Sequence, residues 1–517
     1  MSDHILPEAN PIAGGPAAVR HEAELHPSRL AQNALGLPGV LFCIVTGAAP
    51  IAAMLFNVPV AVLGGGFAAP AAFLVATIVL TIFAVGYIEM ARAVTAAGGF
   101  YSFVTHGFGP IVGMGTAALI SLCYVIFTCA VIGVTGYFAS TSINDWFSID
   151  LPAWVYMVVF LAIITTLAWF HIELTSKILG VFLVTELIGL LIFGFAILFQ
   201  GGDSGLSLSP LNPAEIFDNS AAVKAFGAGA AGVALFGAFW SWVGFEMAPN
   251  YAEESKDPHK IAGIAMYTSV IGLGILYIFI SWMFVTGWGN QGAADAVAKQ
   301  YAGDYASAFY PLTDRYVGSA LTTLFELLII TGSFACTLAF YNTSSRYFFS
   351  MGREGLLPRA LGRVHPTHRS PYLASMLVTV LVALYAGAFT LADSSSLAAL
   401  LKLGTWSPLL GVLGILAIQA LVSFAIIRYF LTTGRGNHHR IKTFLAPLIG
   451  GLAQIGACYL LIKYRGDLSG AGDNWFVKLI PWFVLLIFIS GIVAALYWRK
   501  SQPEKYNAIG RFVHEDA

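Results

Sequence analysis

Charged residues are scarce in this 517-residue sequence. Asp, Glu, Lys and Arg make up only 10% of it, whereas hydrophobic residues make up 58% and aromatic residues 14%. Because about a quarter of a soluble domain is charged, this composition excludes an ordinary soluble fold and predicts an integral membrane protein. The formal net charge of -1 leaves no basic excess to attract nucleic acid, so we expect no nucleic-acid partner.

Cysteine is also scarce, and its number is odd. The five cysteines lie inside apolar segments, which argues against a disulfide framework and favours packing roles. The eleven histidines fall in tails and loops, so none is expected at membrane depth as a metal ligand or a base. An intramembrane enzyme would need such groups. We therefore expect no enzymatic activity, no metal site and no cofactor.

Long apolar runs recur at the length that spans a bilayer. Irregular backbone cannot lie exposed in lipid, so each run of roughly 20 residues predicts a helix, or a broken helix shielded by its neighbours. The first 33 residues are too polar for a signal peptide, and we expect the first span to direct insertion. Twelve spans are predicted, near residues 34–60, 67–92, 111–139, 153–170, 177–199, 228–252, 261–288, 317–350, 372–392, 397–428, 443–462 and 476–498.

These spans predict one all-α membrane domain, residues 34–498, between two cytoplasmic tails, 1–33 and 499–517. The orientation follows from the excess of Lys and Arg on the cytoplasmic side of membrane proteins. Most of the 26 Lys and Arg residues fall on one side when both termini are placed there. We expect a multi-pass protein of the cytoplasmic membrane. The outer loop 289–316 is the longest candidate for an external helix or lid.

Two spans carry interruptions in their middle. The first contains Thr46-Gly47-Ala48-Ala49-Pro50-Ile51, and the sixth contains Trp240-Ser241-Trp242-Val243-Gly244-Phe245-Glu246. Pro50 removes a helical hydrogen bond, Gly244 permits unwinding, and such breaks in matching places of two halves indicate a solute site. Spans one and six stand five apart, as an inverted repeat of five plus five helices requires. The alternative is that Gly and Pro only kink these helices.

Carboxylates inside apolar spans are the next candidates. Glu186 lies in a stretch where a charged carboxylate would cost roughly 2.5–3.5 kcal/mol at the midplane. It is either a coupling group that faces a cavity or a cation, or a neutral acid that bonds a neighbouring helix. Glu326 is expected near the outer end of span eight in a structural role. Glu89 precedes Arg92 at the inner end of span two, which favours a gating or structural ion pair.

Polar and aromatic residues of other spans complete the candidates. Tyr124 and Thr128 stand one turn apart in span three and can line one cavity, as can Phe340 and its neighbours in span eight. Core packing is the alternative for each aromatic residue. Gln419 in span ten is a buried amide that needs partners, either along a hydrated pathway or between two helices.

Four stretches of the chain resemble the amino acid, polyamine and organocation permeases, which have the LeuT-type fold. Glu253 to Pro258 is similar to the family's E-E-x-K-x-P signature, and Glu89 to Tyr101 to its E-x-x... G-G-x-Y pattern. Arg353 to Pro358 is similar to its R-x-G-x-L-P ending of span eight. Ala48 to Ala52 occupies the place of its unwound loop in the first span. The resemblance covers most of the chain.

The resemblance implies alternating access, with substrate held between broken spans one and six. Trp240, Ser241, Gly244 and Glu246 match the W-S-x-x-G-x-E motif of agmatine-antiporter-like members. The resemblance implies that Trp240 is an aromatic gate, that Glu246 is a coupling or gating carboxylate, and that Phe340 faces the substrate. It also implies two helices after the repeat of five plus five.

The sequence departs from this family at three points, one of which is the absence of the usual proline ahead of Ala97-Gly98-Gly99. Glu186 falls where some proton-coupled relatives carry a lysine that replaces a sodium ion, which leaves protons, sodium or neither as the driving ion. Pro50 stands in the loop whose amides usually hold a substrate carboxylate, and it supplies no donor. This weakens the case for a standard α-amino acid and keeps polyamines and other amines open.

We therefore expect a secondary active permease for amino acids or related amines, coupled to protons or to exchange. The candidate substrate-binding residues are Thr46, Gly47, Ala48, Ala49, Pro50, Ile51, Tyr124, Trp240, Ser241, Gly244 and Phe340. The candidate coupling or gating residues are Glu89, Glu186 and Glu246. A non-transporting sensor of the same fold is the alternative, and the sequence leaves the oligomeric state open.

Overall fold

The computed structural model describes residues 35–94, 98–169, 172–203, 205–218, 230–290, 292–300, 305–433, 439–469 and 474–510. Over these residues the chain is helical, and the one β-bridge joins Leu35 to Ser255. Ten helical stretches of this part are long and apolar enough to cross a membrane. The all-α membrane prediction is therefore confirmed. The predicted N-terminal tail, 1–33, lies outside the described residues.

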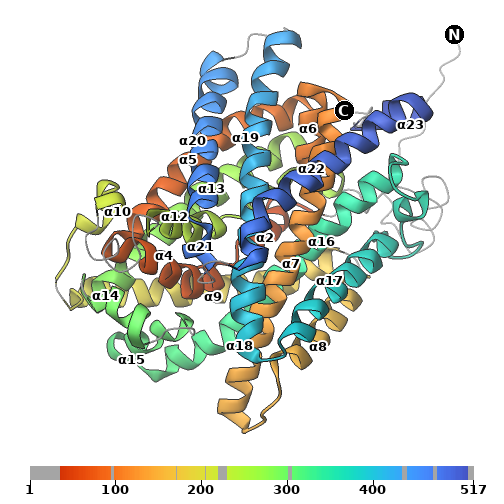
Figure 1. Ribbon diagram of the computed structural model, residues 1–517. Helices are drawn as coiled ribbons and strands as arrows, with labels where there is room; N and C mark the ends of the chain where they lie inside the picture. Colours follow the sequence, from red (N-terminus) through yellow and green to blue (C-terminus); the bar gives the residue numbers. More distant parts are fainter. Residues whose placement is uncertain are drawn as a thin grey trace, which may run out of the picture.

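The predicted spans correspond to the long helices of Figure 1, with two differences. The stretch Leu37–Ala93 runs through two predicted spans, and the helix at Ala153–Leu167 is apolar but shorter than a full span. The first half contains α2 (Leu37–Gly47), α3 (Pro50–Ala52), the π-helix η1 (Ala53–Asn57), α4 (Val58–Gly65), α5 (Ala69–Ala93), α6 (Gly99–Phe108), α7 (Pro110–Phe147), α8 (Ala153–Leu167), α9 (Ile172–Gln200) and α10 (Ala214–Asp218).

The second half begins at the sixth predicted span. It contains α12 (Ala230–Trp240), the 3-10 helix η5 (Phe245–Glu254), α13 (Pro258–Trp288), α14 (Gly292–Asp295), α15 (Tyr310–Tyr316), α16 (Ser319–Arg353), α17 (Tyr372–Ala392), α18 (Ser396–Ala398), η9 (Ala399–Trp406), α19 (Ser407–Thr433), η10 (Ile441–Leu445), α20 (Ala446–Lys463), α21 (Arg465–Ser469), α22 (Trp475–Ser501) and α23 (Pro503–Ala508). In the outer loop predicted at 289–316, the described part forms short helices.

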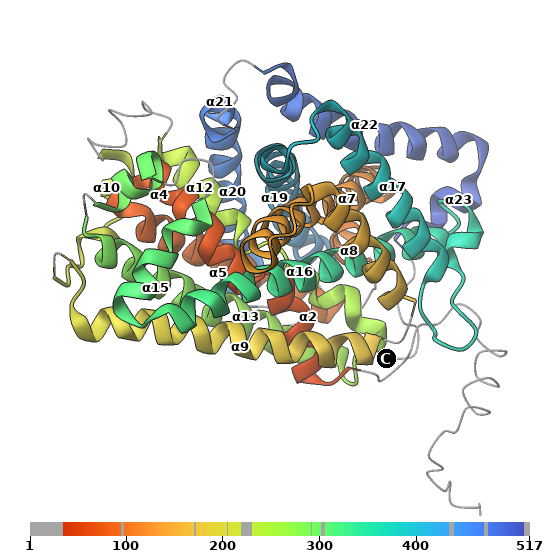
Figure 2. The same cartoon turned by 90° about the horizontal axis from the view of Figure 1, so that it is seen from below.

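Helix α7 forms the centre of the bundle. It is 38 residues long, most of its residues are buried, and it packs against α16, α22, α6, α19 and α8. By contrast, α9 runs along one edge (Figure 2) and turns apolar side chains such as Val181, Ile188 and Ile192 outward. Such exposed apolar faces suit contact with lipid. The core of the protein therefore lies around α7, with the broken spans beside it.

The first span breaks where the sequence predicts. Helix α2 ends at Gly47, and Ala49 has a φ of 43° in the left-handed region, which is rare for residues other than glycine. Helix α3 then begins at Pro50, which suits a first helical position because it needs no hydrogen-bond partner for an N–H. The following π-helix, Ala53–Asn57, widens the next turn.

The sixth span breaks at the same depth, and the two breaks touch. Helix α12 ends at Trp240, and Gly244 has a φ of 118° before η5 begins. A β-carbon at Gly244 would lie 2.9 Å from the carbonyl carbon of Gly47 and 3.2 Å from the amide nitrogen of Ala48. The backbones of the two broken spans are thus in direct contact, which only glycine at position 244 permits.

Gln419 of α19 has the second of its two predicted roles, a contact between two helices. Its Oε1 accepts a hydrogen bond of 2.9 Å from Nε2 of Gln454 in α20, and both side chains are buried. The buried amide therefore joins two helices.

Replacing Gly244 with alanine is predicted to destabilise the protein. A side chain at this positive φ costs about 1–3 kcal/mol in backbone strain before the contact with Gly47 is counted. We expect Gly244→Ala to lower the melting temperature in detergent. Gly272→Ala is the matched control, because open space surrounds Gly272 in α13. Equal melting temperatures of the Gly244→Ala and Gly272→Ala variants would contradict the contact between the breaks.

Candidate functional site

A small cavity lies where the two broken spans meet. Its volume is about 40 Å³, room for a few water molecules and far below the roughly 300–1,000 Å³ of an open ligand pocket. Six of the predicted residues line it, namely Gly47, Ala48, Ala49, Trp240, Ser241 and Phe340. The described conformation therefore has a contracted cavity at the predicted place.

Seven further residues line the cavity and were not predicted from the sequence. They are Ala52, Ala53, Phe56, Asn57, Val131, Val134 and Cys336. Asn57 could have been found, because it and Thr46 are the polar side chains of an otherwise apolar stretch from 37 to 65. The valines and alanines carry no signal that separates them from packing residues.

Two aromatic side chains of the lining, Trp240 and Phe340, pack on Phe127 and form an aromatic wall at the cavity. The ring of Trp240 lies 4.8 Å from that of Phe127 and 6.2 Å from that of Phe340, centroid to centroid, and the last two are 5.6 Å apart. Such faces bury apolar ligand groups and attract cations. The wall brings together α12, α7 and α16, which are far apart in the sequence.

The polar side of the cavity is built by one hydrogen bond between the broken spans. Nδ2 of Asn57 donates to Oγ of Ser241 at 3.0 Å, and this hydroxyl donates to the carbonyl oxygen of Gly237 at 2.8 Å. Asn57 and Ser241 are both buried, with exposed fractions of 4% and 1%. The pair is the polar contact through which a solute group can be oriented.

Side chains from three other helices satisfy the backbone at the first break. Sγ of Cys336 donates to the carbonyl oxygen of Gly47 at 3.1 Å, and the Tyr277 hydroxyl donates to that of Ala48 at 3.0 Å. The amide of Ile51 donates to Oε2 of Glu186 at 3.3 Å. An unpaired backbone polar group in a membrane costs several kcal/mol, so these hydrogen bonds stabilise the non-helical backbone of the break.

Glu186 is therefore placed at the first break and outside the cavity lining. It is 2% exposed, and a β-carbon at Gly332 of α16 would lie 2.5 Å from its Oε1, so a glycine leaves space for the carboxylate. None of the ion pairs among the described residues includes Glu186. Its hydrogen bond to Ile51 links the charge on Glu186 to the geometry of the break.

Glu246 occupies the corresponding place at the second break. The Tyr124 hydroxyl donates to its Oε1 at 2.7 Å, and the amide of Gly244 donates to its Oε2 at 3.2 Å. The Tyr87 hydroxyl donates to its carbonyl oxygen at 3.3 Å. Tyr124 thus contacts the carboxylate and does not line the cavity, and Thr128 bonds back to the carbonyl oxygen of Tyr124.

The remaining predicted residues lie apart from the cavity. Thr46, Pro50, Ile51 and Gly244 belong to the breaks and are buried behind the lining. Glu89, near the end of α5, lies 3.4 Å from Nη1 of Arg92 and 3.4 Å from Nζ of Lys442. It joins α5 to η10. Glu326 accepts a hydrogen bond from the Trp146 indole at 3.1 Å.

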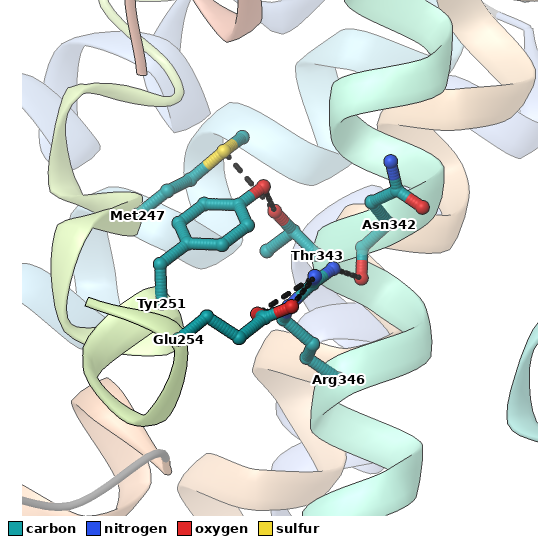
Figure 3. Close-up of polar contacts among 6 residues, drawn as sticks. All are labelled: Met247, Tyr251, Glu254, Asn342, Thr343 and Arg346. Carbon is teal, nitrogen blue, oxygen red and sulfur yellow. Dashed lines mark hydrogen bonds and ion pairs between the residues drawn. The ribbon is translucent and has the colours of Figure 1, made fainter. Parts of the chain in front are cut away.

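A second buried polar cluster joins η5 to α16. Nε and Nη2 of Arg346 donate to the two carboxylate oxygens of Glu254 at 2.8 and 3.0 Å, and Nη1 donates to the carbonyl oxygen of Asn342. Figure 3 shows the Tyr251 ring beside this pair, with Arg346 4.6 Å from its centroid. Both charged side chains are at most 5% exposed.

This cluster also holds the start of the first span. The amide of Leu35 donates to the carbonyl oxygen of Glu254 at 2.8 Å, and the amide of Lys256 donates to that of Leu35 at 3.0 Å. Glu254 belongs to the motif noted in the sequence, but its partner Arg346 lies 92 residues away. The cluster therefore ties η5, α16 and the segment before α2 together.

A helical membrane bundle with two broken spans that meet at a central cavity is the architecture of a solute carrier. A family model described as amino acid permease matches residues 39–513, nearly the whole chain. The protein belongs to the amino acid permease family.

Curated relatives agree with this family. The chain is 23% identical to the branched-chain amino acid permease BcaP of Bacillus subtilis, over 83% of this chain and 85% of the relative. It is 24% identical to the methylthioribose transporter of the same organism, over 85% and 88%. It is 22% identical to the low-affinity putrescine importer PlaP of Escherichia coli, over 63% and 69%. These names indicate a transporter and not an enzyme.

Breaking the buried ion pair is predicted to be costly. Removing one partner leaves an uncompensated buried charge, which typically costs about 3–5 kcal/mol. We expect Glu254→Gln and Arg346→Gln each to lower the melting temperature strongly, and the double variant to lose less than the sum. Arg315→Gln is the control, because the Arg315–Asp203 pair is about half exposed and such pairs contribute about 1 kcal/mol or less. Additive losses would contradict the coupling of the buried pair.

Proposed function

We propose that this protein is a secondary active transporter of amino acids or related amines that works by alternating access. The observation that carries the proposal is the cavity at the contact of two broken spans, lined by Trp240, Ser241 and Phe340. The relatives are named for a branched-chain amino acid, methylthioribose and putrescine, and the first and third support this substrate class. The cytoplasmic membrane, with both termini inside, is the proposed location.

The proposed fold has twelve spans and the inverted repeat of five plus five helices. The stretch Leu37–Ala93 supports it, because Gly66 between α4 and α5 has a positive φ of 54° and divides the stretch into two spans. The breaks at Gly47 and Gly244 fall in the first and sixth spans of this count. The spans formed by α20 and α22, which follow α19, would be the two additional ones.

Alternating access needs one gate on each side of the cavity, and the two gates open in turn. On the side of α6, the Arg346–Glu254 pair ties η5 to α16 and the cavity is contracted. Opening this side requires η5 and α2 to move away from α16, which exposes the cavity to the cytoplasm in the proposed orientation. The aromatic wall of Trp240, Phe127 and Phe340 is the proposed gate above the substrate. Glu89, which ties α5 to η10, is a further proposed gating residue.

Coupling is assigned to the two carboxylates at the breaks. Glu186 accepts a hydrogen bond from the Ile51 amide, and Glu246 accepts one from the Gly244 amide. Protonation removes the negative charge that strengthens each bond. We propose that a proton on Glu186 loosens the first break and so links proton movement to opening. A sodium ion at Glu186 is the alternative outcome of the test below.

Replacing the gate and the coupling carboxylate is predicted to impair uptake without unfolding the protein. We expect Trp240→Ala and Glu246→Gln each to reduce initial uptake by reconstituted vesicles at least tenfold, because the first removes one ring of the aromatic wall and the second removes a carboxylate at the second break. Trp482→Ala is the control, since Trp482 is 61% exposed on α22. Normal uptake by both site variants would overturn the site assignment.

Replacing Glu186 with glutamine is predicted to change the coupling. Glutamine retains an acceptor for the Ile51 amide but cannot release a proton. We expect transport by Glu186→Gln to lose most of its dependence on pH, measured as uptake in vesicles at fixed substrate with and without sodium. Glu326→Gln, near Trp146, should keep the parent profile. If Glu186→Gln instead loses its dependence on sodium, Glu186 is part of a sodium site. If its dependence on pH and on sodium both stay unchanged, Glu186 has no role in coupling.

A further inference from the structure

The segment that follows α22 folds back onto the body of the protein. Helix α23 (Pro503–Ala508) is largely exposed, but the next two residues, Ile509 and Gly510, are buried, and Ile509 has an exposed fraction of 0%. Figure 1 shows α23 and α6 near the same end of the bundle. The end of this segment is therefore anchored, whereas its helix is accessible.

Gly510 is held by two hydrogen bonds of its backbone, and the site has no room for a side chain. Its amide donates to Oε2 of Glu354 at 3.1 Å, and its carbonyl oxygen accepts a hydrogen bond from Oγ of Ser102 at 3.3 Å. Its φ is 67°, and a β-carbon would lie 2.8 Å from Cβ of Thr105. A larger residue would clash with α6, so the docking is specific.

The carboxylate of Glu354 connects three segments of the chain. The backbone of this residue forms the C-cap of α16, its Oε2 accepts a hydrogen bond from the amide of Gly510, and its Oε1 accepts one of 3.0 Å from the Tyr101 hydroxyl in α6. Glu354 is 6% exposed. Hydrogen bonds to a buried carboxylate are among the stronger ones, so this junction holds α6 against α16.

Helix α6 in turn lies against the inner half of the broken sixth span. A β-carbon at Gly99, the first residue of α6, would lie 2.5 Å from Oδ1 of Asn250 in η5 and 3.3 Å from the hydroxyl of Tyr347 in α16. Element η5 also carries Glu246 and Glu254. Because the start of α6 lies against both η5 and α16, a movement of η5 away from α16 also breaks the contact of η5 with α6.

We propose that Pro503–Gly510 is a latch that restrains opening of the transporter on the side of α6. The proposal rests on the proposed function, because it assigns this side the opening movement of alternating access. Docked, the segment completes the Glu354 junction and keeps α6 and η5 in the closed position. Undocked, it frees α6 and shifts the population toward the form open on this side. The exposed face of α23 leaves the latch accessible from the same side.

The chemical reactivity of Cys43 can be used to measure opening of the α6 side. It lies in α2, which packs against η5 and α16, and it is 3% exposed in the closed form. A variant that keeps Cys43, has serine at Cys336 so that a donor to the Gly47 carbonyl remains, and has alanine at the other three cysteines is placed in membrane vesicles that expose the α6 side. The rate of Cys43 modification by a maleimide then reports opening of this side.

The latch variant is Ile509→Asp and the matched control is Asn507→Asp. Both add one negative charge to the same segment, but Asn507 is exposed and Ile509 is buried. We expect Ile509→Asp to speed the modification of Cys43 at least fivefold and Asn507→Asp to leave it unchanged. Gly510→Ala, which meets Thr105, is expected to match Ile509→Asp.

Two results would overturn the latch. One is an unchanged Cys43 rate in Ile509→Asp and Gly510→Ala. The other is equal acceleration at Cys129, measured in a variant that keeps only that buried thiol of α7, since this would mean general loosening of the fold. Transport by the parent protein is measured separately. If the parent does not transport but Ile509→Asp still speeds the modification of Cys43, the proposed function is rejected and the conformational role of the latch is kept.

Discussion

The structure depends on one constraint, the satisfaction of backbone polar groups where two membrane helices are broken. In lipid an unpaired N–H or C=O group costs several kcal/mol, so a break persists only when protein groups replace the lost helical bonds. Here Cys336, Tyr277 and Glu186 bind the first break, while Glu246 binds the amide of Gly244 at the second. The contact of Gly244 with Gly47 then joins both breaks into one site.

This constraint explains why carboxylates stand at both breaks. A carboxylate is a strong acceptor for a backbone amide, and it is also the group whose charge can change during transport. Placing Glu186 and Glu246 on the amides of Ile51 and Gly244 makes the shape of the broken spans depend on charge. In the proposed mechanism, a structural role and a coupling role use the same atoms.

Local features of the fold could be predicted from the sequence. Pro50 and Gly244 act on their own backbone, so the positions of both breaks follow from neighbouring residues, and the apolar runs give the helices. Contacts between distant segments could not be predicted. Tyr124 was expected to line the cavity, but it lies on Glu246, and Asn57 was overlooked although it bonds Ser241. Glu254 belonged to a recognised motif, yet the sequence did not indicate its partner Arg346.

The most direct test of the central claim is substrate counterflow in vesicles reconstituted with the purified protein. Vesicles are loaded with one unlabelled amino acid, polyamine or simple amine at a time, and the transient accumulation of the same labelled compound is followed. Counterflow needs no knowledge of the driving ion. The account predicts saturable counterflow for at least one of these compounds. Compounds that stabilise the protein against heat but give no counterflow would contradict a transporter and indicate a sensor.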